Sequence, residues 1–184
     1  KIPELELELP KTVAYVKSKL DDFGLSYKEY VNGNGLSVLI EGSEPGKCLA
    51  IRADMDALPV HEETGLEFQS IHPGNMHACG HDSHTAIALT AAKILNENKD
   101  KLKGSVKFIF QPGEEIPGGA KPMIEEGVLE NPKVDFIIGM HGGHLAEIPR
   151  GSIAFKDNEM MAAMDKFTIE VNGKGGHGAS PHLA

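Results

Sequence analysis

The chain has 184 residues, of which 40% are hydrophobic and 24% are charged, and its formal net charge at pH 7 is −9. Such a composition is that of a globular protein with one sizeable core and room for the start of a second domain. With a pI near 5.4 and no cluster of lysine or arginine, nucleic-acid binding is excluded as the main function.

Membrane insertion and a disulfide framework are also not expected. No run approaches the roughly 18 apolar residues of a membrane span, and the N-terminus lacks the apolar core of a signal peptide. Only two cysteines, Cys48 and Cys79, are present, and they lie far apart in the sequence. We therefore expect a cytoplasmic protein with neither a membrane nor a nucleic acid as its partner.

The first third of the chain predicts a helix and a hairpin. Glu4–Leu9 alternates glutamate and leucine, which fits a half-buried strand or a helix, and both remain open. A helix is predicted over Pro10–Phe23, with proline at its first position and Gly24 as its stop. Two strand-like stretches, Ser26–Val31 and Leu36–Glu41, are separated by an Asn-Gly-Asn-Gly sequence that is typical of a hairpin.

The middle of the chain decides the fold class. Three apolar, strand-like runs end in residues that can bind metal or transfer protons: Cys48–Ala53 before Asp54 and Asp56, Val106–Phe110 before Glu114 and Glu115, and Phe136–Met140 before His141. Helices are predicted between them, over Ser83–Asn96 and about Gly118–Glu126. This alternation predicts an α/β fold with a mostly parallel sheet, flanking helices and a ligand site beyond the carboxyl ends of the strands.

A second domain is predicted near the end of the chain. Ser152–Phe155 and Phe167–Val171 have the pattern of strands, and the composition changes between Asp157 and Met161. We assign residues 1–160 to the N-terminal part of the first domain and residues 161–184 to the beginning of the second.

A metal site is predicted just before the second helix. Cys79 and His81 are two residues apart, so both side chains can lean to the same side of an extended or turn backbone. A thiolate beside an imidazole suits zinc or another borderline divalent ion better than magnesium or calcium. The alternative is an inert cysteine in a histidine-rich loop.

The ends of the strands supply further candidates. Adjacent side chains point in different directions, so one of Glu114 and Glu115 can bind a metal while the other acts as a general base; the alternative is a solvated acidic turn. Asp54 and Asp56 share a face, where they can bind metal, brace a ligand histidine or cap a turn. His141 lies between glycines and is a credible third or fourth ligand.

A glycine-rich segment offers a different function. Gly173–Gly178 matches G-x-G-x-x-G after a predicted strand, as in dinucleotide sites. The acidic residue that such sites carry about 20 positions later has no counterpart in the sequence. Nucleotide binding is therefore kept as an alternative function.

Five motifs, in this order, resemble the amidohydrolase branch of the aminoacylase and carboxypeptidase-G metallopeptidases, which includes hippurate hydrolases, auxin-conjugate hydrolases and N-acetyl-diaminopimelate deacetylases. The resemblance covers nearly the whole chain. The motifs are Arg52–Pro59, Met76–Asp82, Gln111–Glu115, Gly139–His141 and Gly173–His182.

The resemblance implies a two-metal site on a di-zinc exopeptidase-like catalytic domain. The ions would be zinc or manganese, with cobalt or nickel as further candidates, and the substrate would be a small N-acyl amino acid. The resemblance implies that Cys79 is a bridging ligand and that His81, Glu115 and His141 are terminal ligands. It also implies that Glu114 is the general base and that Asp56 supports the ligands.

The resemblance also implies a smaller ferredoxin-like α+β domain, which serves as a lid and as the dimerisation domain of a homodimer. His177 would then reach the site of a second subunit and stabilise the oxyanion. Family members are considerably longer, so we expect this chain to be a piece of such an enzyme, with incomplete metal binding and little activity on its own. A non-catalytic metal-binding or interaction module on the same scaffold is the alternative.

Overall fold

The fold was analysed in a computed structural model. It describes residues 1–116, 118–143, 149, 151–161, 163, 165 and 167–183. The chain divides into two compact units, Lys1–Leu145 and Ala146–Ala184, and each is described by itself.

The first unit contains five strands and three α-helices among its described residues. The strands are β1 (Tyr27–Tyr30), β2 (Gly35–Glu41), β3 (Glu44–Asp54), β4 (Lys103–Gln111) and β5 (Phe136–Gly139). The helices are α1 (Pro10–Asp22), α2 (His81–Glu97) and α3 (Ala120–Glu125), with short 3₁₀ helices at Val31–Gly33 and Lys99–Lys101. All the strands and helices predicted between Pro10 and Met140 are confirmed, with boundaries that differ by a few residues.

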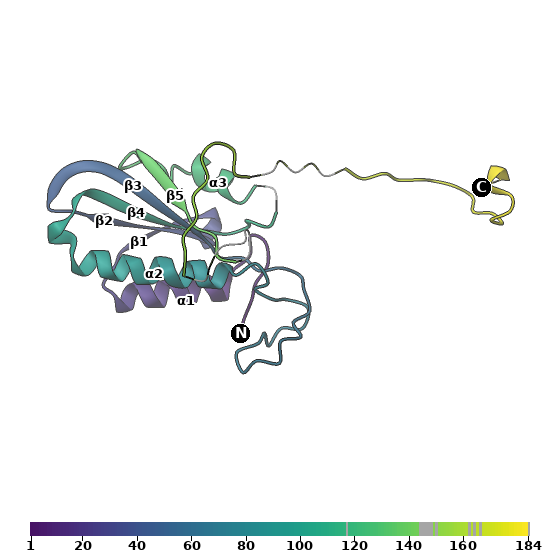
Figure 1. The fold of residues 1–184 in the computed structure, drawn as a ribbon, viewed down its shortest axis with the longest axis horizontal. Helices are drawn as coiled ribbons and strands as arrows, with labels where there is room; N and C mark the ends of the chain where they lie inside the picture. Colours follow the sequence, from purple (N-terminus) through teal and green to yellow (C-terminus); the bar gives the residue numbers. More distant parts are fainter. Residues whose placement is uncertain are drawn as a thin grey trace. The chain divides into compact units, whose positions relative to one another are not determined.

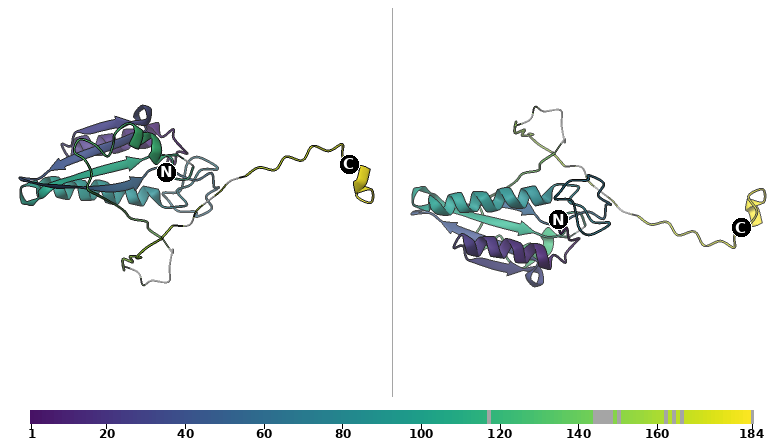
Figure 2. Two further views of the ribbon diagram at one scale, coloured as in Figure 1. Left: turned by 90° about the horizontal axis from the view of Figure 1, so that it is seen from above. Right: turned by 90° about the horizontal axis from the view of Figure 1, so that it is seen from below.

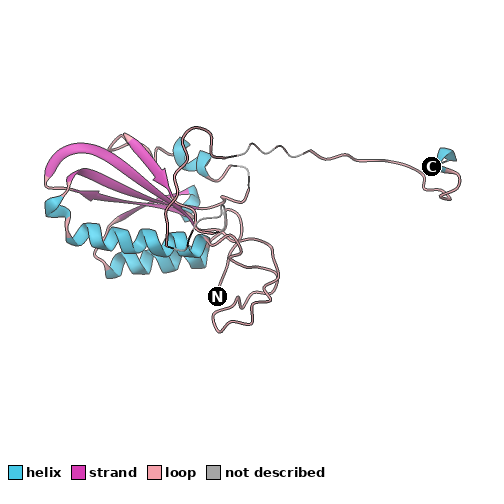
Figure 3. Ribbon diagram, in the orientation of Figure 1, coloured by secondary structure: helices cyan, strands magenta, loops and turns pink. Residues whose placement is uncertain are grey.

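The strands form one sheet (Figure 3), and their order in it is β1-β2-β4-β3-β5. β3 runs parallel to both β4 and β5, as predicted for the strands that carry the candidate site residues. The predicted hairpin is confirmed as well, because β1 pairs antiparallel with β2. β2 also runs antiparallel to β4. The protein is therefore an α/β protein whose sheet contains both parallel and antiparallel pairs and is flanked by helices.

Each face of the sheet has its own core. Helices α1 and α2 run side by side along one face (Figures 1 and 2), where Val16, Leu89 and Phe108 belong to one buried cluster. On the other face, Met123 of α3 packs in a cluster with Ile109 of β4. Phe108 and Ile109 point to opposite faces because side chains alternate along a strand. None of the helices in the described part of the chain combines the length and hydrophobicity that a membrane span needs.

Glu4–Leu9 forms neither of the two regular structures that the alternation allowed. Leu5 makes only an isolated bridge with Ala57. The carboxylate of Glu4 instead accepts hydrogen bonds from the backbone N–H groups of Lys11 (3.2 Å) and Thr12 (2.7 Å), at the first turn of α1. A carboxylate at this position satisfies N–H groups that have no partner within the helix and interacts favourably with its dipole.

The second unit differs from its prediction in secondary structure. Ser152–Phe155 and Phe167–Val171 are not in strands, and the one regular element among the described residues of this unit is the 3₁₀ helix Pro181–Leu183. A strand needs a neighbouring strand to pair its backbone groups, and neither segment is paired with one among the described residues. The domain boundary near residue 160 and the ferredoxin-like fold of the second domain stay predictions.

Candidate metal centre

The candidate site lies where three parallel strands end. β3 ends at Asp54, β4 at Gln111 and β5 at Gly139. Asp54 pairs with Gln111, and Arg52 pairs with Gly139, so the three carboxyl ends share one edge of the sheet. The segments that leave these strands therefore start side by side, as the sequence predicted.

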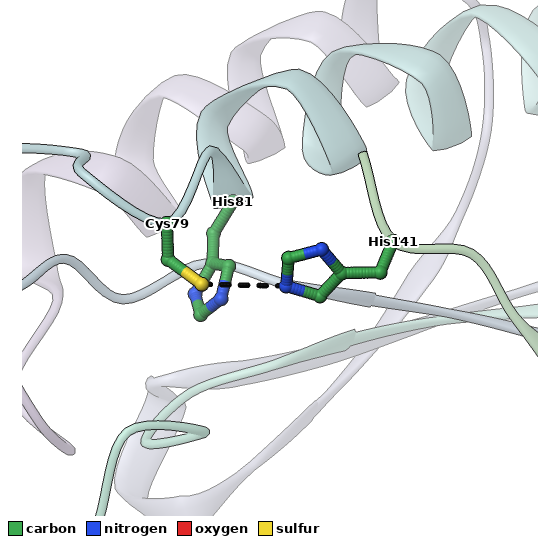
Figure 4. Close-up of side chains that lie close together, drawn as sticks. All are labelled: Cys79, His81 and His141. Atoms are coloured by element: carbon green, nitrogen blue, oxygen red, sulfur yellow. Dashed lines mark hydrogen bonds between the residues drawn. The ribbon is translucent and has the colours of Figure 1, made fainter. Parts of the chain in front are cut away.

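Cys79, His81 and His141 meet at this edge, although 60 residues separate His81 from His141. Figure 4 shows their side chains turned toward one another, with Nε2 of His141 3.3 Å from Sγ of Cys79. Gly80 has a φ of +87°, a left-handed conformation that suits glycine, and α2 begins at the next residue. This turn presents Cys79 from the loop and His81 from the first turn of the helix.

The acidic pair after β4 also contacts His81. Nε2 of His81 lies 3.7 Å from Oε2 of Glu114 and 3.6 Å from Oε1 of Glu115. Cys79, His81 and His141 form one group whose ligand atoms lie within 4.8 Å of one another, and His81, Glu114 and Glu115 form another. His81 is common to both groups and is therefore the centre of the cluster.

Asp56 holds the acidic pair in place. Its two carboxylate oxygens accept the backbone N–H groups of Glu114 (2.9 Å) and Glu115 (3.0 Å). Burial alone raises the pKa of Asp56, but the neighbouring imidazole of His81 and the hydrogen bonds from these two N–H groups outweigh it and lower the pKa below 3.8. Asp56 is fully buried, so the charge that stabilises the turn is shielded from solvent.

His81 lies in a strongly acidic environment. Burial opposes its charged form, but Asp56, Asp54 and Glu114 together raise its pKa above 6.5. The contact with Asp56, 3.5 Å from Nδ1 to Oδ1, is long for a hydrogen bond, so most of this attraction is electrostatic. Several carboxylates around one buried imidazole create a local field that favours a cation.

The same negative field acts on the thiol of Cys79. It favours the charged form of His81 but disfavours the charged, thiolate form of Cys79. Burial, a hydrogen bond to Glu115 and the charges of Glu115, Glu114 and Asp54 raise its pKa to about 12. A thiolate at neutral pH would therefore require a compensating positive charge, and a coordinating metal ion deprotonates a thiol outright.

Buried polar atoms without a hydrogen-bond partner indicate whether these residues fit a metal. Within the described part of the chain, both ring nitrogens of His81 and Oε1 of Glu115 are buried without a hydrogen-bond partner. Buried polar atoms are normally paired, and unpaired ones often mark the position of an ion or a water molecule. Sulfur, nitrogen and carboxylate oxygen are the ligands that zinc and similar divalent ions prefer. The residues fit such an ion.

His84 is a member of the site that the sequence analysis did not single out. It is buried, with 3% of its surface exposed, and its Nδ1 lies 2.6 Å from Oδ1 of Asp54. The signal in the sequence is the spacing of three from His81, which places both rings on one face of α2.

The segment that carries His177 belongs to the second unit. The backbone N–H of Ala179 donates to Nδ1 of His177 at 3.2 Å, a contact within this segment. The strand and α-helix that a dinucleotide-binding glycine loop requires are absent from the described residues 167–183. The role of His177 stays a prediction, and the structure does not support the alternative of nucleotide binding.

Fold and site together define a class of protein: an α/β protein with a candidate cation centre of thiol, imidazole and carboxylate groups beyond the ends of parallel strands. Residues 50–181 match the model of peptidase family M20/M25/M40, and the chain belongs to this family. The resemblance inferred from the five motifs is confirmed.

Relatives in this family include enzymes named for amide hydrolysis. The chain is 45% identical over 181 residues to the N-acyl-L-amino acid amidohydrolase of Geobacillus stearothermophilus, covering 98% of this chain and 48% of the relative. It is 44% identical over 185 residues to N-acetyldiaminopimelate deacetylase of Bacillus subtilis, covering 100% and 48%.

A solved structure gives the same result for the fold. The YXEP protein of Bacillus subtilis, described as a dinuclear metal binding peptidase from the M20 family, matches with a TM-score of 0.73 and 43% identity. The match covers 77% of this chain and 40% of that chain. The chain spans less than half the length of the relatives it matches.

Proposed function

We propose that this chain supplies most of the metal centre of a hydrolase that cleaves the amide bond of N-acyl amino acids. The observation that carries the proposal is the convergence of Cys79, His81, His141 and the acidic pair from three separate loops. The names of the relatives support the reaction and the substrate class.

In this proposal the centre holds two divalent cations, zinc or manganese, with cobalt or nickel as further candidates. Cys79 would be the ligand shared by the two ions, and His81, Glu115 and His141 would each hold one of them. When bound, the ions would polarise the amide carbonyl and lower the pKa of the attacking water. Two features support this assignment, namely the dinuclear relative and the unpaired ligand atoms of His81 and Glu115.

Glu114 is proposed as the general base. Its side chain is 30% exposed, so it reaches the open side of the site, while that of Glu115 is 22% exposed. The Glu114 carboxylate would take a proton from the attacking water and deliver it to the leaving amine. Asp56 fixes the position of Glu114 by accepting its backbone N–H.

Two further parts of the proposal rest on the motif Gly173–His182. His177 is proposed to donate a hydrogen bond to the developing oxyanion in the site of a second subunit. That role requires a homodimer of the complete protein, with the second unit as part of its lid and dimerisation domain.

A matched pair of variants in the complete natural protein tests the proposal. We expect Glu114→Gln to retain both metal ions while hydrolysis falls by about 10²–10⁴-fold, the usual contribution of a general base. Glu115→Gln should instead lose metal, because it replaces a ligand. Elemental analysis and turnover of a panel of N-acyl amino acids measure both effects.

The results for the variants test the role of Glu114, and the result for the wild-type protein tests the hydrolase activity. Unchanged turnover of Glu114→Gln removes Glu114 from the mechanism. If the wild-type protein holds metal but cleaves no member of the panel, the hydrolase proposal is wrong and a non-catalytic metal-binding module takes its place.

A further inference from the structure

A continuous chain of contacts runs from β3 to the loop that carries His141. Arg52 contacts Asp54, with 2.5 Å between Nη1 and Oδ2. Oδ1 of Asp54 lies 2.6 Å from Nδ1 of His84, and Nε2 of His84 lies 2.8 Å from the backbone nitrogen of Gly142. The buried carboxylate is thereby connected to the residue that follows His141.

These contacts fix the tautomer of His84. Gly142 can only donate through its backbone N–H, so Nε2 of His84 must be the acceptor and the ring proton lies on Nδ1. That proton is donated to the carboxylate of Asp54, which also accepts from Arg52. Both nitrogens of His84 and both oxygens of Asp54 are thus occupied.

The same occupancy argues against a separate metal site here. Asp54, His81 and His84 have ligand atoms within 4.8 Å of one another, which is the spacing of a cation site. However, the guanidinium of Arg52 already provides the positive charge beside Asp54. A metal would also have to displace the hydrogen bonds of His84 on both sides of its ring.

Gly142 connects these residues to His141 through hydrogen bonds of its own backbone. The carbonyl of Gly142 accepts from Nδ1 of His141 at 2.7 Å, which leaves the lone pair of Nε2 directed toward Cys79. The N–H of the same residue is held by His84. One glycine therefore joins the buried network to the imidazole that faces the metal centre.

We propose that Arg52, Asp54 and His84 are positioning residues that fix the backbone at Gly142 and thereby aim Nε2 of His141 at the metal centre. The inference rests on the proposed role of His141 as a ligand. His141 is exposed, and its ring meets that of His84 edge-on with centroids 4.7 Å apart. Beside this contact, the hydrogen bond from Gly142 to His84 limits how the loop moves. Partners that orient metal ligands in this way typically change metal affinity by 10–100-fold when removed.

Two substitutions of His84 separate its two hydrogen bonds. In His84→Gln the amide oxygen takes the place of Nε2 and can still accept from Gly142. In His84→Asn the amide takes the place of Nδ1, keeps the contact with Asp54 and cannot reach Gly142. The experiment is a Co²⁺ titration of the complete natural protein, followed by the Cys79 thiolate-to-cobalt absorption and by the ligand-field bands.

We expect His84→Asn to bind cobalt about 10–100-fold more weakly, with altered ligand-field bands but a retained thiolate band. His84→Gln keeps the acceptor for Gly142 but gives up the contact with Asp54, so it should lose clearly less affinity than His84→Asn. Wild-type affinity and bands in His84→Asn would overturn the proposal, and so would an equal loss in both variants, since the effect would then not depend on the acceptor for Gly142.

A second pair of variants, at Gly142, tests the same hydrogen bond without changing His84. Gly142→Pro removes the N–H donor from an exposed loop, whereas Gly142→Ala keeps it, and the added Cβ would lie 3.6 Å from Nε2 of His84, an ordinary contact. Weaker cobalt binding in the proline variant alone supports the proposal, and equal binding in both overturns it. If wild-type protein gives no thiolate band, the proposed metal centre itself is wrong, which is a different result from failure of the positioning chain.

Discussion

Asp56 illustrates how much of the site depends on single residues. The sequence placed Asp54 and Asp56 on one face and left open whether they bind metal, brace a histidine or cap a turn. In the structure they differ: Asp54 bonds to His84 and Arg52, while Asp56 accepts the N–H groups of the acidic pair. The spacing predicted their shared location, but their partners lie far away in the sequence and could not be predicted from it.

Asp56 also gives a prediction about pH. Its pKa is lowered in the folded protein, so its stabilising contribution is fully present above the unfolded value of 3.8 and is lost as the pH falls through the lower folded value. In metal-free protein, Asp56→Asn should lower the free energy of unfolding at pH 7 by roughly 1–3 kcal/mol, because the amide can accept only one of the two bonds well. This difference should shrink below pH 3.8.

Urea denaturation of both proteins at pH 7 and pH 3 measures the effect, with the exposed Asp100→Asn as control. A difference that grows on acidification would contradict the assignment of these hydrogen bonds to Asp56.

The predicted elements were most accurate where their pattern was regular. The helix from Pro10, the hairpin and the three strands that end at the site were all predicted from periodicity and turn residues. Glu4–Leu9 was ambiguous because glutamate and leucine suit both strands and helices. The carboxylate of Glu4 caps α1 instead, a contact that depends on the path of the chain rather than on the local pattern.

Strand β4 contains a buried lysine that links it to the segment before β5. Nζ of Lys107 donates to the carbonyls of Val128 (3.0 Å), Glu130 (2.7 Å) and Pro132 (3.1 Å). Lys107 is only 3% exposed, so no bulk water can replace it. This one side chain satisfies three backbone acceptors of the connection between α3 and β5.

Lys107→Met should therefore destabilise the protein, because the methionine fills similar space but leaves the carbonyls without their donor. We expect a loss of about 1–3 kcal/mol or more in the free energy of unfolding. Lys103→Met, at the exposed start of the same strand, is the matched control and should change stability by less than about 0.5 kcal/mol. Chemical denaturation checks both, and equal effects would show that Lys107 does not hold the connection.

At the scale of the whole molecule, the parallel arrangement of three strands explains why the site could be predicted at all. Residues that follow such strands meet at one edge, whatever their separation in sequence. The link from His84 to Gly142 escaped prediction because it joins a helix to a loop 58 residues later and neither residue type indicates the pairing. Periodicity predicts the edge of the sheet but not the contacts across it.

The same arrangement predicts that metal stabilises the fold as a whole. In the complete protein, a chelator should lower the midpoint of thermal unfolding, since a ligand present at 100 times its Kd contributes about 2.7 kcal/mol. Hydrogen exchange should increase most in residues 77–84, 112–116 and 140–143, and much less in β4. Readdition of Zn²⁺ should reverse the change while Mg²⁺ should not. Uniform exchange throughout the sheet would contradict a role for these three loops as the metal-holding segments.

The strand order has a consequence for biosynthesis. His141 follows β5, which docks beside β3, a strand completed more than 80 residues earlier. During translation, Cys79, His81 and the acidic pair leave the ribosome first, while the position beside β3 is still empty. A nascent chain could therefore offer an ion only part of the proposed set of ligands, and binding by all of these residues must wait until β5 has joined the sheet.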